Sequence, residues 1–331
     1  MKWARFFSFQ AWLCLVLLLL IVCSVLFGAT ALTPDQYWEA FLTPTSPAGE
    51  VLWTIRAPRA LMAGLIGAGL GLAGATLQGL LRNPLADPGV LGVSAFAGLG
   101  AATAIALGMA GLSGAVEAGA LAGAALAGAI VLGLSARFKE PEALILMGIS
   151  LSSLGGALTA LIFNFSPSPV ATAEIMNWLL GSVENRDIGD ILRALAPMVL
   201  GAGLCLWSGR GLTMLTLGEE TASLSGLPMA RFRMAAVAGA ALITGAAVAA
   251  AGVVGFVGLA APHLVRSFVG DEPGRALAPS ALAGGLLLVA SDLFARLAPS
   301  EQELKLGVVT ALFGAPLFAL VALRSARSWR S

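Results

Sequence analysis

Two arginines that flank a proline at the start of a long apolar run are the first candidates for chemistry in this sequence. The stretch reads Arg56-Ala57-Pro58-Arg59, and the apolar run continues to Leu81. A guanidinium group can grip a carboxylate through two parallel hydrogen bonds. The plainer interpretation is that these side chains extend along the membrane surface toward lipid phosphates. A site for acidic side chains of a partner is therefore one hypothesis for Arg56 and Arg59.

A second charged group lies in another apolar run near the end of the chain. Asp292 and Arg296 are four residues apart, so on a helix they share a face and can pair. An acidic residue close to a membrane span normally has such a partner. Arg296 joins Arg56 and Arg59 as a candidate for carboxylate binding.

A short polar turn, Arg82-Asn83-Pro84-Leu85-Ala86-Asp87-Pro88-Gly89, separates two long apolar runs, with Gln78 just before it. Asn-Pro and Asp-Pro favour turns, because proline disfavours helix at the residue before it. Physics alone favours a plain hairpin between two helices here.

Another polar segment, residues 217–228, reads LGEETASLSGLP. It is too polar to enter a membrane and predicts one or two short helices on the membrane surface, ended by Gly226 and Pro228. Such an element could dock into a groove of a soluble partner, whereas the plainer alternative is a solvated loop.

The residues required for bond chemistry are not present in a recognisable pattern. We find no pair of acids, no Ser/Lys dyad and no His/Glu metal set in the apolar runs, and no Gly-rich phosphate loop ending in Lys-Ser/Thr. His263 is the only histidine, and Cys14, Cys23 and Cys205 lie inside apolar runs without metal or disulfide spacing. The sequence therefore predicts no catalytic residue, no metal site and no cofactor bound by this chain.

The composition indicates a membrane protein. Hydrophobic residues make up 58% of the 331 positions, charged residues only 11%, and the mean hydropathy is +0.90. A soluble domain carries about 25% charged residues. The net charge of +1 gives no reason to expect nucleic-acid binding.

Apolar runs of membrane length predict an all-α, polytopic helical bundle of about ten spans, formed as one transmembrane domain over residues 1–331. Lys and Arg are concentrated in the segments that this topology places on the side of both termini, so the positive-inside rule puts both termini in the cytoplasm. Five spans followed by five predict an inverted repeat. The expected spans are 11–32, 58–81, 90–108, 115–135, 143–165, 190–208, 231–253, 256–269 (short and broken), 276–297 and 304–324.

Small residues predict close helix packing. The chain has 41 glycines, and four of them recur at helical spacing in one run: Gly64, Gly67, Gly71 and Gly74. Small side chains let membrane helices approach one another closely. These four should form a packing face.

Five motifs together resemble the permease subunits of bacterial ABC importers for iron–siderophores, haem and cobalamin, the FecCD-type family. They are RAPR at 56–59, LQGLLRNPLADPGVLG at 77–92, GFVGLAAPHLVR at 255–266, SDLFAR at 291–296 and GVVTALFGAP at 307–316. The resemblance covers the chain from Arg56 to about Leu323.

The resemblance implies specific partners. Family permeases form dimers around a central path, bind two ATP-binding-cassette ATPases on the cytoplasmic face and receive substrate from a periplasmic binding protein. ATP and magnesium belong to the ATPases. In cobalamin-type relatives, arginines at the positions of Arg56, Arg59 and Arg296 receive acidic residues of the binding protein.

The resemblance also assigns the remaining motif residues. The coupling loop, about 213–228, would contact the ATPase through Gly218, Glu219, Glu220, Ala222, Ser225, Gly226 and Pro228, with Ser225 standing where relatives often carry Leu. Structural roles, such as helix packing and loop anchoring, are expected for Gln78, Arg82, Asn83, Pro84, Asp87, Pro88, Pro262, His263, Arg266, Asp292, Gly307, Gly314 and Pro316.

The expected function is the permease of an ATP-driven importer in the bacterial inner membrane, most simply a homodimer. Iron–siderophore is the first substrate expected, with haem and cobalamin as alternatives. An ion-coupled secondary transporter is a rival from another class, but it needs ionisable relays inside the spans. Only Glu117 and Asp292 come close, both near span ends. An intramembrane enzyme is a second rival, without a residue set to support it.

Overall fold

The computed structural model describes residues 2–135, 137, 141–166, 168–270, 272–299 and 303–328, and these are helical without β-strands. Seven of their helices are long and apolar enough to cross a membrane, and three more are apolar but shorter. The seven are Phe6–Leu26, Pro47–Leu81, Ala115–Ser135, Glu142–Asn164, Ile188–Leu215, Met229–Ala251 and Pro273–Leu297. The shorter three are Val93–Ala106, Val257–Val269 and Leu306–Pro316. Each expected span thus corresponds to one of these helices, while the number that cross the membrane stays a prediction.

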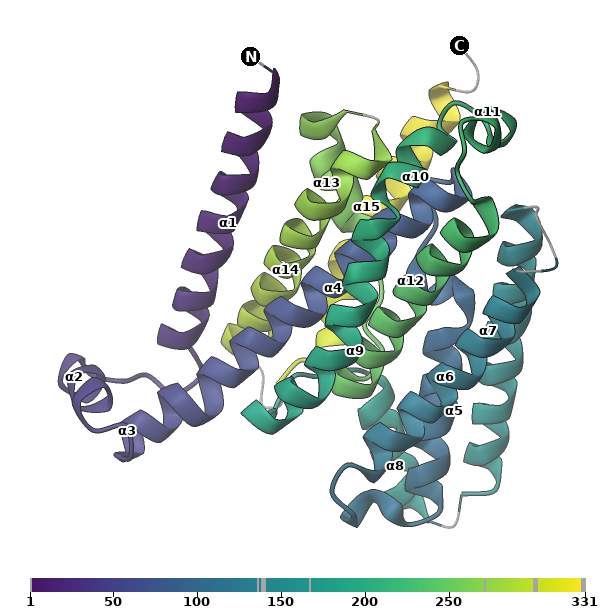
Figure 1. Ribbon diagram of the computed structural model, residues 1–331. Helices are drawn as coiled ribbons and strands as arrows, with labels where there is room; N and C mark the ends of the chain where they lie inside the picture. Colours follow the sequence, from purple (N-terminus) through teal and green to yellow (C-terminus); the bar gives the residue numbers. More distant parts are fainter. Residues whose placement is uncertain are drawn as a thin grey trace.

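The helices run in chain order as follows: α1 Lys2–Leu26, α2 Pro34–Leu42, α3 Pro47–Gly49, a π-helical segment Glu50–Arg56, α4 Ala57–Leu81, a 3₁₀ turn Pro88–Leu91, α5 Val93–Ala106, a 3₁₀ turn Met109–Gly111, α6 Ala115–Ser135, α7 Pro141–Asn164, α8 Pro169–Leu179, α9 Ile188–Trp207, α10 Gly209–Leu215, α11 Glu219–Leu224, α12 Met229–Ala251, α13 Val257–Val269, α14 Pro273–Leu297 and α15 Leu306–Ser328. In Figure 1, α1 begins and α15 ends at the same end of the bundle as α11. The short helices α2, α3 and α8 lie at the opposite end.

The first expected span was wrong at its C-terminal end. Helix α1 stops at Leu26 rather than continuing to residue 32. Its last carbonyl groups accept hydrogen bonds from the side chains of Arg56 and Tyr37, which lie in later segments. A helix can therefore end before the apolar run does, when side chains from other segments donate hydrogen bonds to its last carbonyl groups.

Short helices outside the bundle were not expected. Helix α2 begins with a capping box, in which the side chains of Thr33 and Gln36 bind each other's backbone N–H groups. The side chain of Ser168 caps the first turn of α8. In both helices, a proline in the first turn comes directly after the capping residue. This local signal is not visible in hydropathy alone.

Glycines bring the central helices into backbone contact, as their spacing predicted. A Cβ atom on Gly67 would lie 2.3 Å from the Gly284 carbonyl oxygen of α14. A Cβ atom on Gly74 would lie 1.8 Å from the Gly258 carbonyl oxygen of α13. Gly64 is packed less tightly, with only ordinary contacts. Helices α4 and α12 are almost entirely buried as a result, whereas α1 and α7 expose most of their apolar surface.

Candidate docking and coupling sites

The three candidate docking arginines lie together at one end of α4 and α14. Arg59 donates hydrogen bonds from Nε (2.9 Å) and Nη2 (2.8 Å) to Oδ1 of Asp292. Arg296 pairs with the other oxygen of Asp292 at 3.1 Å, which confirms the predicted i,i+4 pair. The Asp292 side chain is 1% exposed, so it sits between two guanidinium groups away from water.

Glu303, which follows α14, completes this charged cluster. Its carboxylate binds Arg59 through both oxygens, with Nη1 at 3.1 Å from Oε2 and a second contact to Nη2. Sequence reasoning missed Glu303, because it lies 244 positions from Arg59 and belongs to none of the motifs. Nε, Nη1 and Nη2 of Arg59 are therefore all engaged by carboxylates of the same chain.

Arg56 and Arg296 hold the end of α1. Arg56 donates to the carbonyl oxygens of Leu26 at 2.7 Å and of Thr30. Arg296 donates to the carbonyl oxygen of Ser24 at 3.1 Å and to its hydroxyl. The bonds to Ser24 and Leu26 satisfy carbonyls in the last turn of α1, where Leu26 also accepts from the Tyr37 hydroxyl.

All three arginines are more than nine-tenths buried in the isolated chain. Their contacts explain why the chain can enclose them: each guanidinium has carboxylate or carbonyl acceptors. Docking to a binding protein stays a prediction for them, and their present role is to join α1, α4 and α14.

At the opposite end, the polar turn after α4 is fixed to three helices. Arg82 ends α4 with a left-handed backbone (φ 48°) and donates from its side chain to the Leu215 carbonyl of α10. Gln78 donates to the carbonyls of Ala86 (3.3 Å) and Leu259 (3.4 Å). The predicted plain hairpin is therefore an anchored structure.

His263 also anchors this turn. Its Nε2 lies 2.8 Å from the carbonyl oxygen of Pro84, which can only accept, so Nε2 carries the proton. This contact agrees with the loop-anchoring role assigned to His263 from sequence.

Asn83 and Asp87 shape the turn from within. The Asn83 side chain accepts from the Leu85 amide at 2.9 Å, and that of Asp87 accepts from the Gly89 amide at 2.8 Å. Burial raises the pKa of the Asp87 carboxyl, and the hydrogen bonds from Gly89 and Leu259 oppose this shift. Pro88 then starts the 3₁₀ turn that leads into α5.

The other motif residues expected to be structural differ in burial, from the buried Pro262 to the exposed Pro316. Pro262 lies inside α13, and Arg266 and Pro262 line a small cavity of about 70 Å³ beside Gln78. A Cβ on Gly307 would meet the Leu180 carbonyl oxygen at 2.4 Å, and one on Gly314 would meet the Phe256 side chain at 2.3 Å. Pro316 lies inside α15.

The candidate coupling segment forms α11, as the short-helix prediction required. Gly218 (φ +104°) precedes it and Gly226 (φ +86°) follows it, both with backbone angles that suit glycine. Glu219 pairs with Arg233 of α12 at 2.5 Å, and Ala222 is buried. The ion pair thus attaches α11 to α12, and the side chain of Ala222 is held away from water.

The outward face of α11 carries an apolar side chain. Leu224 is 84% exposed, and Glu220, Ser225 and Pro228 are exposed beside it. Leu224 was not among the predicted contact residues, although it is the one large apolar residue within Glu219–Leu224, which was the available signal. An apolar side chain held out from a helix is one that can insert into a groove of a protein partner.

Comparison with known proteins now defines the class. Residues 16–324 match the FecCD transport family. The vitamin B12 import system permease BtuC of Escherichia coli O157:H7 is 39% identical over 95% of both chains. BtuC of Vibrio cholerae is 40% identical over 94% of this chain and 93% of that protein. The ABC transporter permease YvrB of Bacillus subtilis is 38% identical over 85% of this chain and 81% of that protein.

A solved structure agrees with these relatives. It is described as an inward-facing conformation of a metal-chelate type ABC transporter, and it superimposes with a TM-score of 0.84 and 31% identity over 96% of this chain and 99% of its own. The protein is therefore an integral membrane permease of the ABC importer class, a transport subunit and not an enzyme, and ATP hydrolysis belongs to a partner ATPase. It belongs to the FecCD transport family.

Proposed function

We propose that this chain is one half of a homodimeric pore in the bacterial cytoplasmic membrane, which imports a metal chelate. Two ATPases would bind the end that carries α11, and a periplasmic binding protein would dock at the end that carries Arg56, Arg59 and Arg296. The separation of these two groups at opposite ends of α4 is the observation that carries the proposal.

Helix α4 connects the two ends physically. Arg82, which caps its C-terminus, is bonded to α10, directly before α11, and Arg59 in its first turn belongs to the charged cluster with Asp292 and Glu303. The Glu219–Arg233 pair joins α11 to the buried helix α12. A displacement of α11 by the ATPase would therefore move α4 and α12 together, which is the rigid coupling that alternating access requires.

Docking would require a carboxylate exchange at Arg59. Because Asp292 and Glu303 occupy its N–H groups, an acidic side chain of a binding protein must displace one of them. Glu303 is the one that can leave, since its side chain is 27% exposed and that of Asp292 is 1% exposed. We expect Glu303→Gln to strengthen capture of the binding protein several-fold, and unchanged or weaker capture would contradict the exchange.

Two substrates are supported about equally. Iron–siderophore is proposed because it is the commonest cargo of the family, and the BtuC relatives, named for vitamin B12 import, favour cobalamin. Haem is a third candidate of the same chemical kind. All three are large metal chelates, so the same pore mechanism serves each.

ATP-dependent uptake in vesicles is the test. Vesicles would hold this chain with its ATPase and binding protein, and labelled ferric siderophore, cobalamin and haem would be offered in parallel. We expect uptake of one of them that requires both ATP and the binding protein. Uptake that persists without ATP would overturn the proposal in favour of an ion-coupled transporter.

A further inference from the structure

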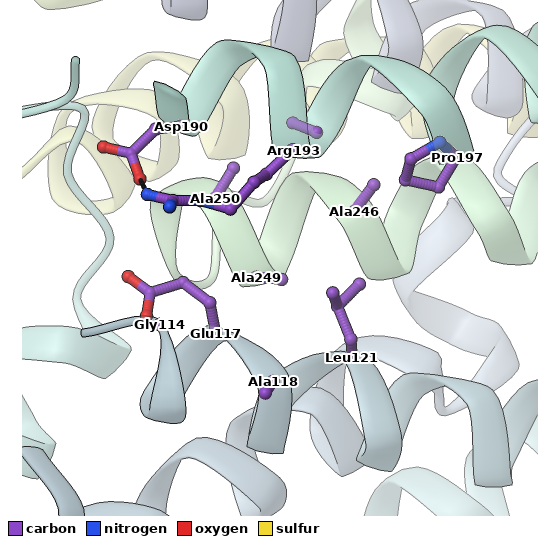
Figure 2. A pocket seen from close by; sticks show the side chains of 11 residues that line it. Gly114, Glu117, Ala118, Leu121, Asp190, Arg193, Pro197, Ala246, Ala249 and Ala250 are labelled. Atoms are coloured by element: carbon purple, nitrogen blue, oxygen red, sulfur yellow. Dashed lines mark hydrogen bonds and ion pairs between the residues drawn. The ribbon is translucent and has the colours of Figure 1, made fainter. Parts of the chain in front are cut away.

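A groove along the surface of the bundle lies between α6 and α9, with α12 as its floor (Figure 2). It consists of two cavities of about 280 and 450 Å³ that share Leu121, Pro197 and Ala246. From Ala118 to Leu132 on α6 the groove extends over about 21 Å, at about 1.5 Å per residue. The hydrocarbon part of one leaflet is about 15 Å thick, half of the whole core of about 30 Å, so the groove is long enough to hold an acyl chain of a lipid in one leaflet.

The inner part of the groove is apolar throughout. The larger cavity is lined only by Ala, Gly, Leu and Pro side chains. The floor is formed by small residues of α12, among them Ala246 and Ala249. In a bilayer such a channel fills with hydrocarbon, since water would gain no hydrogen bonds there.

Charged side chains occur at one end of the groove. Glu117 of α6 pairs with Arg186 at 2.9 Å, and Asp190 of α9 pairs with Arg193 at 2.5 Å. Figure 2 shows Glu117 facing Asp190 and Arg193 across the groove. The four groups carry two positive and two negative charges, which complements a zwitterion better than an anion.

The individual groups fit the two charges of such a headgroup. The Arg193 side chain is 58% exposed, so its guanidinium can bind a phosphate. The Glu117 carboxylate on the opposite wall can accept hydrogen bonds from a primary ammonium group. Pro197, which lies inside α9, has no N–H to donate to the Arg193 carbonyl, so this carbonyl is a further acceptor beside the groove.

We propose that this groove binds one zwitterionic aminophospholipid. One acyl chain lies on the α12 floor, the ammonium group contacts Glu117, and the phosphate contacts Arg193. The inference concerns the lipid-facing surface and goes beyond the transport function.

Native mass spectrometry of the full-length protein in mild detergent tests the proposal. Phosphatidylethanolamine, phosphatidylcholine and phosphatidylglycerol would be added separately. We expect one phosphatidylethanolamine per chain, held at least tenfold more tightly than the other two. Phosphatidylcholine has no ammonium N–H, and phosphatidylglycerol has no cation. Equal affinity for all three lipids would overturn the headgroup assignment.

Two variants with matched controls locate the site. Ala118→Phe fills the groove from an exposed wall position and should weaken phosphatidylethanolamine binding at least tenfold, whereas Ala157→Phe, exposed on α7, should not. Glu117→Gln should remove the preference over phosphatidylcholine, whereas Glu184→Gln, in a partly exposed ion pair with Lys305, should keep it. Lipid binding that is unchanged by Ala118→Phe, or loss of a dimer mass instead of a lipid mass, would overturn the proposal.

Discussion

Replacement of Asp292 by asparagine tests whether the buried charged cluster holds the bundle together. The carboxylate of Asp292 accepts two hydrogen bonds from Arg59, at 2.8 and 2.9 Å, and pairs with Arg296 at 3.1 Å. Removal of one partner from a buried ion pair costs about 3–5 kcal/mol. The lower figure applies here, because the amide oxygen can still accept from Arg59, Arg59 keeps Glu303, and Arg296 keeps the Ser24 carbonyl.

The expected loss of about 3 kcal/mol in the free energy of unfolding corresponds to a decrease of about 6 °C in Tm, at about 2 °C per kcal/mol. Thermal unfolding of the purified protein in detergent, followed by circular dichroism, measures it. The matched control is Glu184→Gln, which removes a partly exposed pair at 3.6 Å and should cost less than about 1 kcal/mol. A Tm for Asp292→Asn that equals the control value would refute the assigned role of the cluster.

The double variant Asp292→Asn with Arg296→Gln separates the pair from its surroundings. If the two residues stabilise each other, the double variant should lose less stability than the sum of the single variants, by about 0.5–3 kcal/mol. Additive losses would mean that Arg296 acts only through its bonds to α1.

Two further predictions concern packing and coupling. Gly74→Ala should force α4 and α13 apart and lower the free energy of unfolding by about 1–3 kcal/mol, because the new Cβ would lie 1.8 Å from a carbonyl oxygen. The control Gly203→Ala on α9, with open space around it, should stay within about 1 kcal/mol of the parent. Equal Tm values for the two variants would contradict the close approach of α4 and α13. Leu224→Asp should leave Tm nearly unchanged, since the side chain is 84% exposed. The same variant should weaken assembly with the ATPase at least tenfold in pull-down titrations. Normal assembly would exclude Leu224 as an anchor.

Much of the fold could be predicted from residue types and local spacing. Apolar run lengths located the long helices, and the glycine spacing in α4 identified the packing face that contacts α13 and α14. The segment 217–228 predicted α11, because glycines and a proline limit a helix there. These features depend on interactions over a few residues, which a sequence displays directly.

The environment of the candidate docking residues could not be predicted in the same way. The sequence singled out Arg56, Arg59 and Arg296, and it paired Asp292 with Arg296, four residues away. It gave no reason to place Glu303 on Arg59 or to bury all three arginines. Those contacts depend on how α1, α4 and α14 meet, and the residues involved are up to 272 positions apart.

The sequence alone determined that the chain is a helical membrane protein, since too few polar residues are available to cover a water-facing surface. Its motifs also indicated the family that the comparisons confirmed. Only the tertiary structure decided which carbonyls and carboxylates satisfy the buried arginines, and which helix walls leave a groove between them. The physical reason is that hydropathy and helix spacing are local properties, whereas the partner of a buried charge is chosen by the packing of distant segments.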